Sequence, residues 1–210
     1  MKLQTIAAYI TALSLVPGVA AAQEATGSVE LMTGQNSSTI DTTLTVPIAP
    51  RLSLFTRNRF TGTYETGEDN LSSFHIFSSN FNLKGGLDLV AETDLIMPAK
   101  IAEPRIGFQY FKSFGDFGMF NYTTVSCKDL NVLFATNLSY NPMFTDLWGL
   151  SANLEAFTDL GPKGHNFSGQ RLRLAPSIGG YKIGFAADFS QNGIAGDFDY
   201  NFGGFAKRNF

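Results

Sequence analysis

The chain has 210 residues, enough for one domain or at most two small ones. Charged residues make up 16% of it, below the roughly 25% of a typical soluble domain, whereas aromatic residues reach 13% and include 20 phenylalanines. A mean hydropathy of +0.01 is too low for a helical membrane protein, in which each span needs about 20 consecutive apolar residues. The net charge of −3 gives no reason to expect nucleic acid as a partner.

The start of the chain has the pattern of a secretory signal peptide. A lysine near the N-terminus is followed by an apolar stretch over 6–15 and by three alanines before Gln23. We expect residues 1–22 to be cleaved and residues 23–210 to form one domain, because no linker or low-complexity run divides them. An exported chain with a single cysteine has no internal disulfide, so other interactions must hold it together.

Beyond the signal, short segments of alternating polarity recur with turn residues such as Gly, Pro, Asn and Asp between them. This pattern predicts an all-β protein of twelve strands, with ten as the alternative count. In chain order, the expected strands are 27–33, 38–48, 51–61, 72–83, 87–97, 104–113, 117–126, 129–140, 147–158, 166–175, 181–190 and 196–210.

Many of these segments have one apolar and one polar face, because successive side chains of a strand point to opposite sides. In 38–48, Ile40 and Leu44 share a face, whereas Asp41 and Thr43 share the other. Two architectures produce this pattern. A soluble sandwich or barrel keeps the apolar faces inside, whereas a transmembrane barrel turns them toward lipid and lines its lumen with the polar faces.

Strand length and the expected connections favour the transmembrane barrel. A tilted strand of about 9–11 residues crosses a bilayer. An even strand count puts both ends of the barrel chain on one side, where the turns should be tight, while the opposite side carries longer loops. The connections expected are 49–50, 84–86 and 114–116 at the first end, and 62–71, 98–103 and 159–165 at the second.

Aromatic residues of the apolar faces gather near the expected strand ends, as the two membrane interfaces select. Those expected near the end with the termini are Tyr110, Tyr140, Trp148, Tyr181 and Phe210, and those near the other end are Phe60, Phe189, Phe198 and Tyr200.

The last segment, DFDYNFGGFAKRNF, alternates in polarity and ends on an aromatic residue. With Phe202, Ala206 and Phe210 on one face, it resembles the C-terminal sorting signal of bacterial outer-membrane β-barrel proteins of porin-like plan. Arg208 departs from that signal, which usually has another aromatic residue there. The resemblance implies a closed antiparallel up-and-down barrel in the outer membrane, surrounded by lipid and inserted by assembly machinery that binds this final strand. Such a barrel must pair its last strand with its first, near 28–33, since an open edge in hydrocarbon leaves backbone groups unpaired.

With the apolar faces outward, the charged side chains of the strands point into the lumen and are candidates to line a pore. If the facing walls stay apart, small polar solutes pass; if they touch, their charges pair and plug the barrel. Twelve strands lie between the filled eight-stranded barrels and the open channels of sixteen or more. The expected lumen residues are Arg57, Arg59, Asp88, Glu92, Asp94, Glu155, Arg171, Arg173, Lys182, Asp188, Asp197 and Asp199.

The sequence has no local signature of an enzyme, and we expect no catalytic site, metal or cofactor. The chain has two histidines. The face occupied by His75 is left open, because Phe74 and Ile76 suggest one alternation and Phe77 the other. His165 precedes Ser168 by three residues, a spacing too loose to predict a nucleophile and its base.

Three functions fit this sequence. The preferred one is a narrow passive pore for small polar solutes in the outer membrane. A sealed barrel with a structural or adhesive role is the alternative, and a soluble exported barrel that binds an apolar ligand is the third. The sequence leaves the solute and the oligomeric state open.

Overall fold

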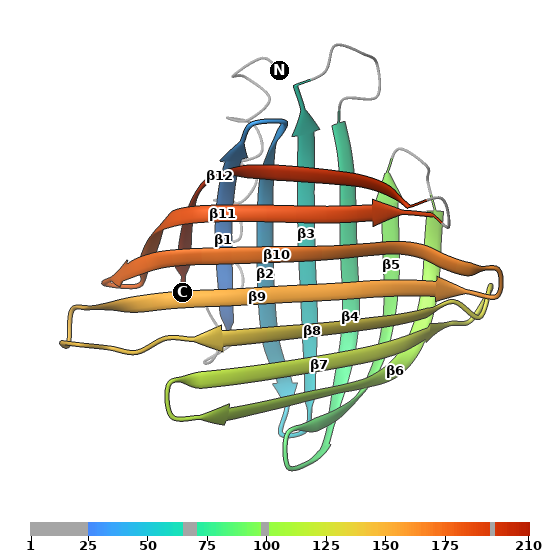
Figure 1. The fold of residues 1–210 in the computed structure, drawn as a ribbon. Coiled ribbons are helices and arrows are strands. Elements are labelled where there is room, and N and C mark those ends of the chain that lie inside the picture. The colour runs from blue at the N-terminus through green and yellow to red at the C-terminus, as the bar shows by residue number, and fades with distance from the viewer. Residues whose placement is uncertain (1–24, 65–70, 98–100, 194–195) are drawn as a thin grey trace.

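The structure of the protein is a computed structural model that describes residues 25–64, 71–97, 101–193 and 196–210. Within these ranges, twelve antiparallel strands form one closed barrel (Figure 1). The expected signal peptide lies outside the described residues. The strands are β1 (Thr26–Gly34), β2 (Ser37–Ala49), β3 (Leu52–Thr63), β4 (Leu71–Lys84), β5 (Leu87–Met97), β6 (Ile101–Phe114), β7 (Phe117–Ser126), β8 (Val132–Tyr140), β9 (Trp148–Gly161), β10 (Gly164–Ile178), β11 (Tyr181–Asn192) and β12 (Asp197–Asn209).

Each strand pairs with its neighbours in sequence, and β12 pairs with β1 to close the barrel. The closing register runs from Ser28 opposite Asn209 to Gly34 opposite Gly203, which confirms the pairing expected for the first strand. Strands β8 to β12 form one wall and cross steeply over β1 to β5 in the opposite wall (Figure 1). Strongly tilted strands therefore bring distant parts of the sequence face to face across the lumen.

The end of the barrel at which β1 begins and β12 ends is called the terminal end here, and the opposite end is called the loop end. The expected contrast between short and long connections is only partly correct. At the loop end, β9 and β10 are joined by residues 162–163 alone, where a longer loop was expected. At the terminal end, residues 141–147 form a longer connection. Within it, the ring of Phe144 packs against that of Trp148, with 4.9 Å between the ring centroids.

Strand β8 begins three residues later than expected, and local hydrogen bonding explains the difference. The hydroxyl of Ser126 accepts hydrogen bonds from the backbone N–H groups of Lys128 and Asp129, both at 3.2 Å. Leu130 has a φ of 57°, a left-handed conformation that ends extended pairing. Leu130 therefore lies in the connection between β7 and β8, in which Cys127 is exposed at the loop end.

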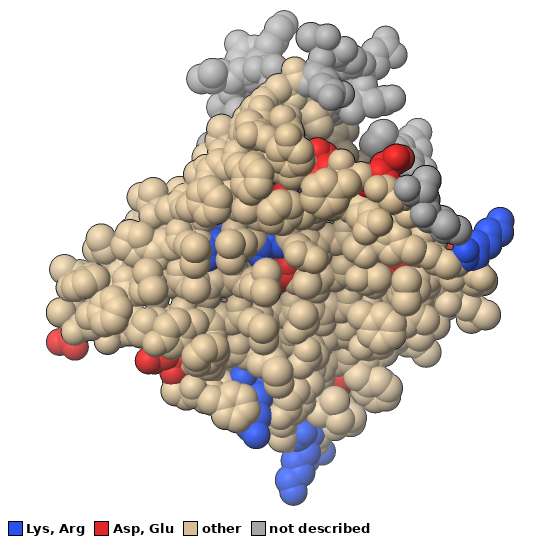
Figure 2. All heavy atoms as spheres, in the orientation of Figure 1, with Lys and Arg blue, Asp and Glu red and all other residues tan. Residues whose placement is uncertain are grey.

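The polarity of the barrel is reversed relative to a soluble protein. Among the described residues, sixteen polar or charged residues are buried against six hydrophobic ones. Large apolar side chains are instead exposed, for example Ile106 at 58%, Ile183 at 66% and Phe198 at 65%. In Figure 2, the side chains of Lys, Arg, Asp and Glu that protrude lie near the edges of the molecule, and only small areas of charged atoms show in the mostly uncharged surface between them. A polar interior of this kind argues against a soluble barrel that holds an apolar ligand.

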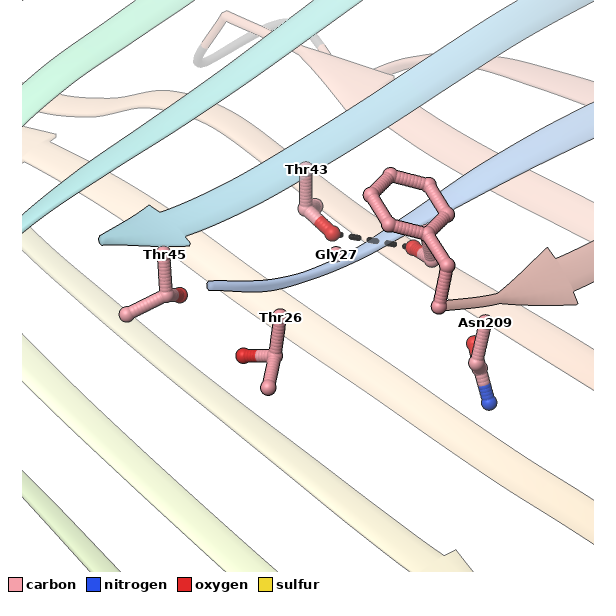
Figure 3. Close-up of a pocket in the computed structure, with 7 residues that line it drawn as sticks. Thr26, Gly27, Thr43, Thr45 and Asn209 are labelled. Atoms are coloured by element: carbon pink, nitrogen blue, oxygen red, sulfur yellow. Dashed lines mark hydrogen bonds between the residues drawn. The ribbon is translucent and has the colours of Figure 1, made fainter. Parts of the chain in front are cut away.

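The C-terminal residue seals the seam between β12 and β1. Gly27 and Phe210 exchange backbone hydrogen bonds of 2.8 and 3.0 Å, and the Phe210 ring covers Gly27. A shallow pocket opens beside this contact between Thr26, Thr45 and Asn209 (Figure 3). Gly27 therefore fills a position at which a side chain would displace the terminal ring.

Replacing Gly27 with Ala should destabilise the barrel by about 1–3 kcal/mol, because a Cβ atom would lie 2.7 Å from the Phe210 ring and 2.6 Å from the Thr43 carbonyl oxygen. Urea titration of the refolded protein in lipid vesicles measures the change. Gly204→Ala is the matched control, since a Cβ there meets only the Gly184 carbonyl oxygen at 3.6 Å. Equal stability of the two variants would contradict a tightly packed seam.

Candidate functional site

The middle of the lumen holds a network of four arginines and four carboxylates, here called the central network. Its members come from six strands on both walls, and each points inward because it lies on the polar face of its strand. The network consists of Glu30 on β1, Asp41 on β2, Arg57 and Arg59 on β3, Glu155 on β9, Arg171 and Arg173 on β10, and Asp188 on β11.

Four of these side chains form a closed ring across the barrel. Arg57 donates to Asp41 on the adjacent strand at 2.8 Å and also to Glu155 on the opposite wall. Arg171 contacts the same two carboxylates, with 3.0 Å to Asp41 and 2.8 Å to Glu155. Each carboxylate therefore joins an arginine of its own wall to an arginine of the facing wall. Charge-assisted hydrogen bonds of this kind are stronger than those between neutral groups.

Arg173 extends the central network along β10 toward the seam. Its guanidinium donates to Glu30 at 2.8 Å and to Asp188 at 2.6 Å. The same group lies over the ring of Phe205, 5.8 Å from its centroid, and approaches the sulfur of Met32 at 3.4 Å. The arginine thus links the ion pairs to a small apolar cluster inside the barrel.

A second cluster, centred on Arg105 of β6, fills the lumen beside β5, β7 and β9. The Arg105 side chain is 2% exposed and forms ion pairs with Glu103 at 2.9 Å and with Asp159 at 3.2 Å. It also donates to the hydroxyl of Thr124 at 3.0 Å, and that hydroxyl donates to Glu92 at 3.0 Å. This Arg105 cluster lies toward the loop end, because Arg105 is paired with Ser126, the last residue of β7, and donates to the carbonyl oxygen of Asn131 at 3.2 Å.

The central network joins the facing walls across the lumen, and the Arg105 cluster adds buried charges toward the loop end. The side chains of Arg171 and Asp41 are each 7% exposed, and that of Glu92 is 1% exposed. A water-filled passage at this level would leave such groups wet. The facing walls therefore touch through ion pairs, which is the second of the two arrangements that the sequence allowed.

Most of the expected lumen residues point inward, but at different levels. Arg57, Arg59, Glu155, Arg171, Arg173 and Asp188 belong to the central network, while Glu92 and Asp94 are buried beside Arg105. Asp88 and Lys182 lie toward the terminal end, where Gln109 donates to Asp88 and Lys182 donates to Asn141. Asp197 and Asp199 are exposed at the loop end, so they border the opening of the barrel and are not part of the central network.

Five charged residues of the two groups were not among the expected lumen residues: Glu30, Asp41, Glu103, Arg105 and Asp159. For two of them, the alternation of polar and apolar residues along the strand indicated the inward face. Glu30 lies between the outward Val29 and Leu31, and Asp41 lies on the polar face of its segment. Their contacts could not be found from one strand alone, because they are made with residues of the facing wall.

The outward face of β12 carries the three residues of the expected sorting signal. Phe202 is 38% exposed and Phe210 is 60% exposed, and Ala206 lies between them on the same face. Arg208, the residue that departs from the signal, lies over the ring of Tyr181 on β11, 5.0 Å from its centroid. Arg208 is not aromatic, but its guanidinium group packs on an aromatic ring at the terminal end through a cation–π contact.

A closed antiparallel barrel with a charged interior and an apolar exterior has the fold of the porin-like bacterial outer-membrane β-barrels. Solved structures share it. The KdgM porin is 8% identical, with a TM-score of 0.50 over 88% of this chain and 99% of that one. The KdgM porin in complex with disordered oligogalacturonate is also 8% identical, with a TM-score of 0.51 over the same shares. LpxR from Salmonella typhimurium is 6% identical, with a TM-score of 0.50 over 87% of this chain and 99% of that one.

At these identities the likeness shows the fold alone. No protein-family model matches the sequence, and no curated protein matches it. No helix among the described residues is long and apolar enough to cross a membrane.

Proposed function

We propose that the protein is a bacterial outer-membrane β-barrel that gives small polar solutes a narrow path, with the central network as its constriction. The observation that carries the proposal is the charged lumen inside an apolar outer wall. Export depends on cleavage after residue 22. The assembly machinery recognises the outward face of β12, with Phe202, Ala206 and Phe210. Both ends of the barrel chain then lie in the periplasm.

Polar groups lead to the constriction from both ends. Asp197 and Asp199 are exposed at the loop end, and the half-buried Asp88 and Lys182 line the terminal end. The constriction between them is made of ion pairs with equal numbers of arginines and carboxylates. Such pairs can exchange partners with a polar solute, whereas an apolar plug offers it no hydrogen bonds.

Planar-bilayer recording tests the constriction. Replacing Arg57 and Glu155 together by Ser removes one of the two direct links of the ring between the walls, leaves the link from Arg171 to Asp41, and keeps the charge balance. Single-channel conductance should therefore rise above that of the unmodified protein. In the control, Asp197 and Asp199 are replaced by Ser. That change should shift ion selectivity toward anions and leave the conductance close to its original value, because both carboxylates border the opening.

A sealed barrel with a structural or adhesive role is the second candidate. The near-complete burial of Arg105 and Arg171 favours it. Separating a buried ion pair costs free energy, because each charge is left buried without its partner. Liposomes that contain the unmodified protein and the Arg57/Glu155 variant separate the two functions. If neither protein lets sugars or salts through, and neither shows conductance steps, the pathway proposal is wrong and the barrel is sealed.

A further inference from the structure

The outward face of the barrel carries a row of polar side chains on β3 and β4. In β4, the buried Ser78 and Asn80 place the even-numbered side chains in the lumen. The odd-numbered Ser73 and His75 therefore point outward, which settles the face of His75 that the sequence left open. Asn58 lies directly opposite His75 in the register of β3 and β4, on the same outward face.

These three side chains are joined by hydrogen bonds in a fixed order. His75 Nδ1 lies 2.9 Å from Asn58 Oδ1, and His75 Nε2 lies 3.1 Å from Ser73 Oγ. The Asn58 amide nitrogen donates to the hydroxyl of Thr56 at 3.0 Å, so its oxygen is free to accept from the imidazole. Nδ1 then carries the hydrogen, and Nε2 accepts the hydroxyl hydrogen of Ser73.

A serine, a histidine and a polar group that orients the histidine are the components of an activated nucleophile. Here the strand register assembles them. Ser73 and His75 share a face because they are two residues apart on one strand, and Asn58 reaches the ring from the adjacent strand. Because the three residues come from two strands, a local sequence motif cannot predict the site.

The surroundings of Ser73 suit an ester with an acyl chain. Ser73 is paired with Phe60 on one side and with Met97 on the other, and Met97 is 41% exposed. The Phe60 ring also contacts His75 edge-on, with 5.2 Å between the ring centroids. Ser73 is the third residue of β4, so it lies near the loop end, where the wall meets the headgroup level of a membrane. An acyl chain can extend from there along the exposed Phe77.

The chain contains a second pair of serine and histidine on the outward face, which provides an internal comparison. His165 Nε2 lies 2.7 Å from Ser168 Oγ, but His165 Nδ1 contacts the backbone carbonyl of Gly193 at 3.0 Å. A register shift between His165 and Phe167 brings the two side chains to one face. Among the residues that the structure describes, no side chain orients His165 through Nδ1, so the site on β3 and β4 is the more complete one.

We infer that Ser73, His75 and Asn58 form a hydrolase site for carboxylic esters of acyl chains at the outer wall. The inference goes beyond the proposed path and uses only the part of that proposal that places the wall in lipid. Ser73 Oγ attacks the ester carbonyl carbon, and its proton passes to His75 Nε2. The carbon–oxygen bond to the alcohol breaks, and the alcohol leaves with that proton. Water then attacks the acyl-serine, gives one proton to His75 and releases the carboxylic acid, and His75 returns the proton to Ser73.

Labelling with a fluorophosphonate and hydrolysis of p-nitrophenyl octanoate in mixed micelles test this site on the refolded full chain. The unmodified protein should be labelled and should release p-nitrophenol. Ser73→Ala should abolish the labelling, and His75→Asn should lower the hydrolysis rate by about 100-fold or more. Asn58 acts as a positioning residue: Asn58→Leu should lower kcat, whereas Asn58→Asp, which keeps the accepting oxygen, should restore it.

Two controls fix the assignment. Ser79→Ala changes an exposed outward serine on the same strand and should leave labelling and rate unchanged. Ser168→Ala tests the second pair, and loss of labelling in that variant instead would overturn the assignment to Ser73. A folded barrel that is neither labelled nor active would show that the three side chains only satisfy one another. These measurements need no ion flow, so their outcome is independent of the conductance experiment.

Discussion

Replacing Arg171 with Met should destabilise the barrel by about 3–5 kcal/mol, because it removes one partner from a set of buried ion pairs. Arg171 touches Asp41, Glu155 and Glu30, each of which then keeps its charge with fewer donors. Methionine replaces the aliphatic part of the arginine side chain, so the change removes the guanidinium group with its charge and its hydrogen-bond donors. Equilibrium unfolding in urea, followed by heat-dependent migration in detergent gels, measures the effect.

The matched control restores the charge balance of the central network. The double variant Arg171→Met with Glu155→Gln removes one charge of each sign, and it should be more stable than Arg171→Met alone. Contacting groups of this kind are not additive, and the difference measures their coupling. If Arg171→Met were as stable as the unmodified protein, the ion pairs of Arg171 would contribute nothing to the stability of the barrel.

Replacing Leu154 with Arg should cost about 2–4 kcal/mol, since an arginine at the middle of the bilayer must leave water. Leu154 lies midway along β9, on the outward face, and is 40% exposed. Its cross-strand partners are Leu138 and Leu172, which continue the apolar surface. The same urea titration in lipid vesicles measures the change, with Leu154→Ala as the control for lost packing.

The depth dependence of this cost is a sharper test than its size. Leu150 lies on the same face of β9, two residues from the start of the strand at the terminal end. Leu150→Arg should therefore cost only about 0–1 kcal/mol, because the side chain reaches the interface. Equal costs at both positions would mean that no bilayer surrounds this wall.

Alternation along each strand was enough to predict most of the fold. The segments expected at 87–97 and 117–126 coincide with β5 and β7, and every other strand overlaps its expected segment. Side-chain period and turn residues are local properties, so a single sequence displays them. The errors fall where local hydrogen bonds compete with strand pairing, as Ser126 does before β8.

Contacts between strands that are not neighbours could not be predicted in the same way. The ring formed by Asp41, Arg57, Glu155 and Arg171 depends on how closely two tilted walls approach each other. The tilt of a strand cannot be predicted from the sequence of that strand alone. In a ring of twelve strands, β3 and β10 are five steps apart and so lie nearly opposite each other, but whether their side chains touch is a matter of a few ångströms. The sequence therefore identified many of the inward charges and left the state of the lumen open.

Cys127 gives the molecule a built-in orientation marker. It is the only thiol of the chain, it is exposed, and it lies in the turn between β7 and β8, at the end opposite Phe210. A maleimide dye that cannot cross membranes will modify vesicle-embedded molecules only when this turn faces the bulk medium. The fraction modified before and after detergent lysis gives the proportion inserted in each direction, without any engineered tag.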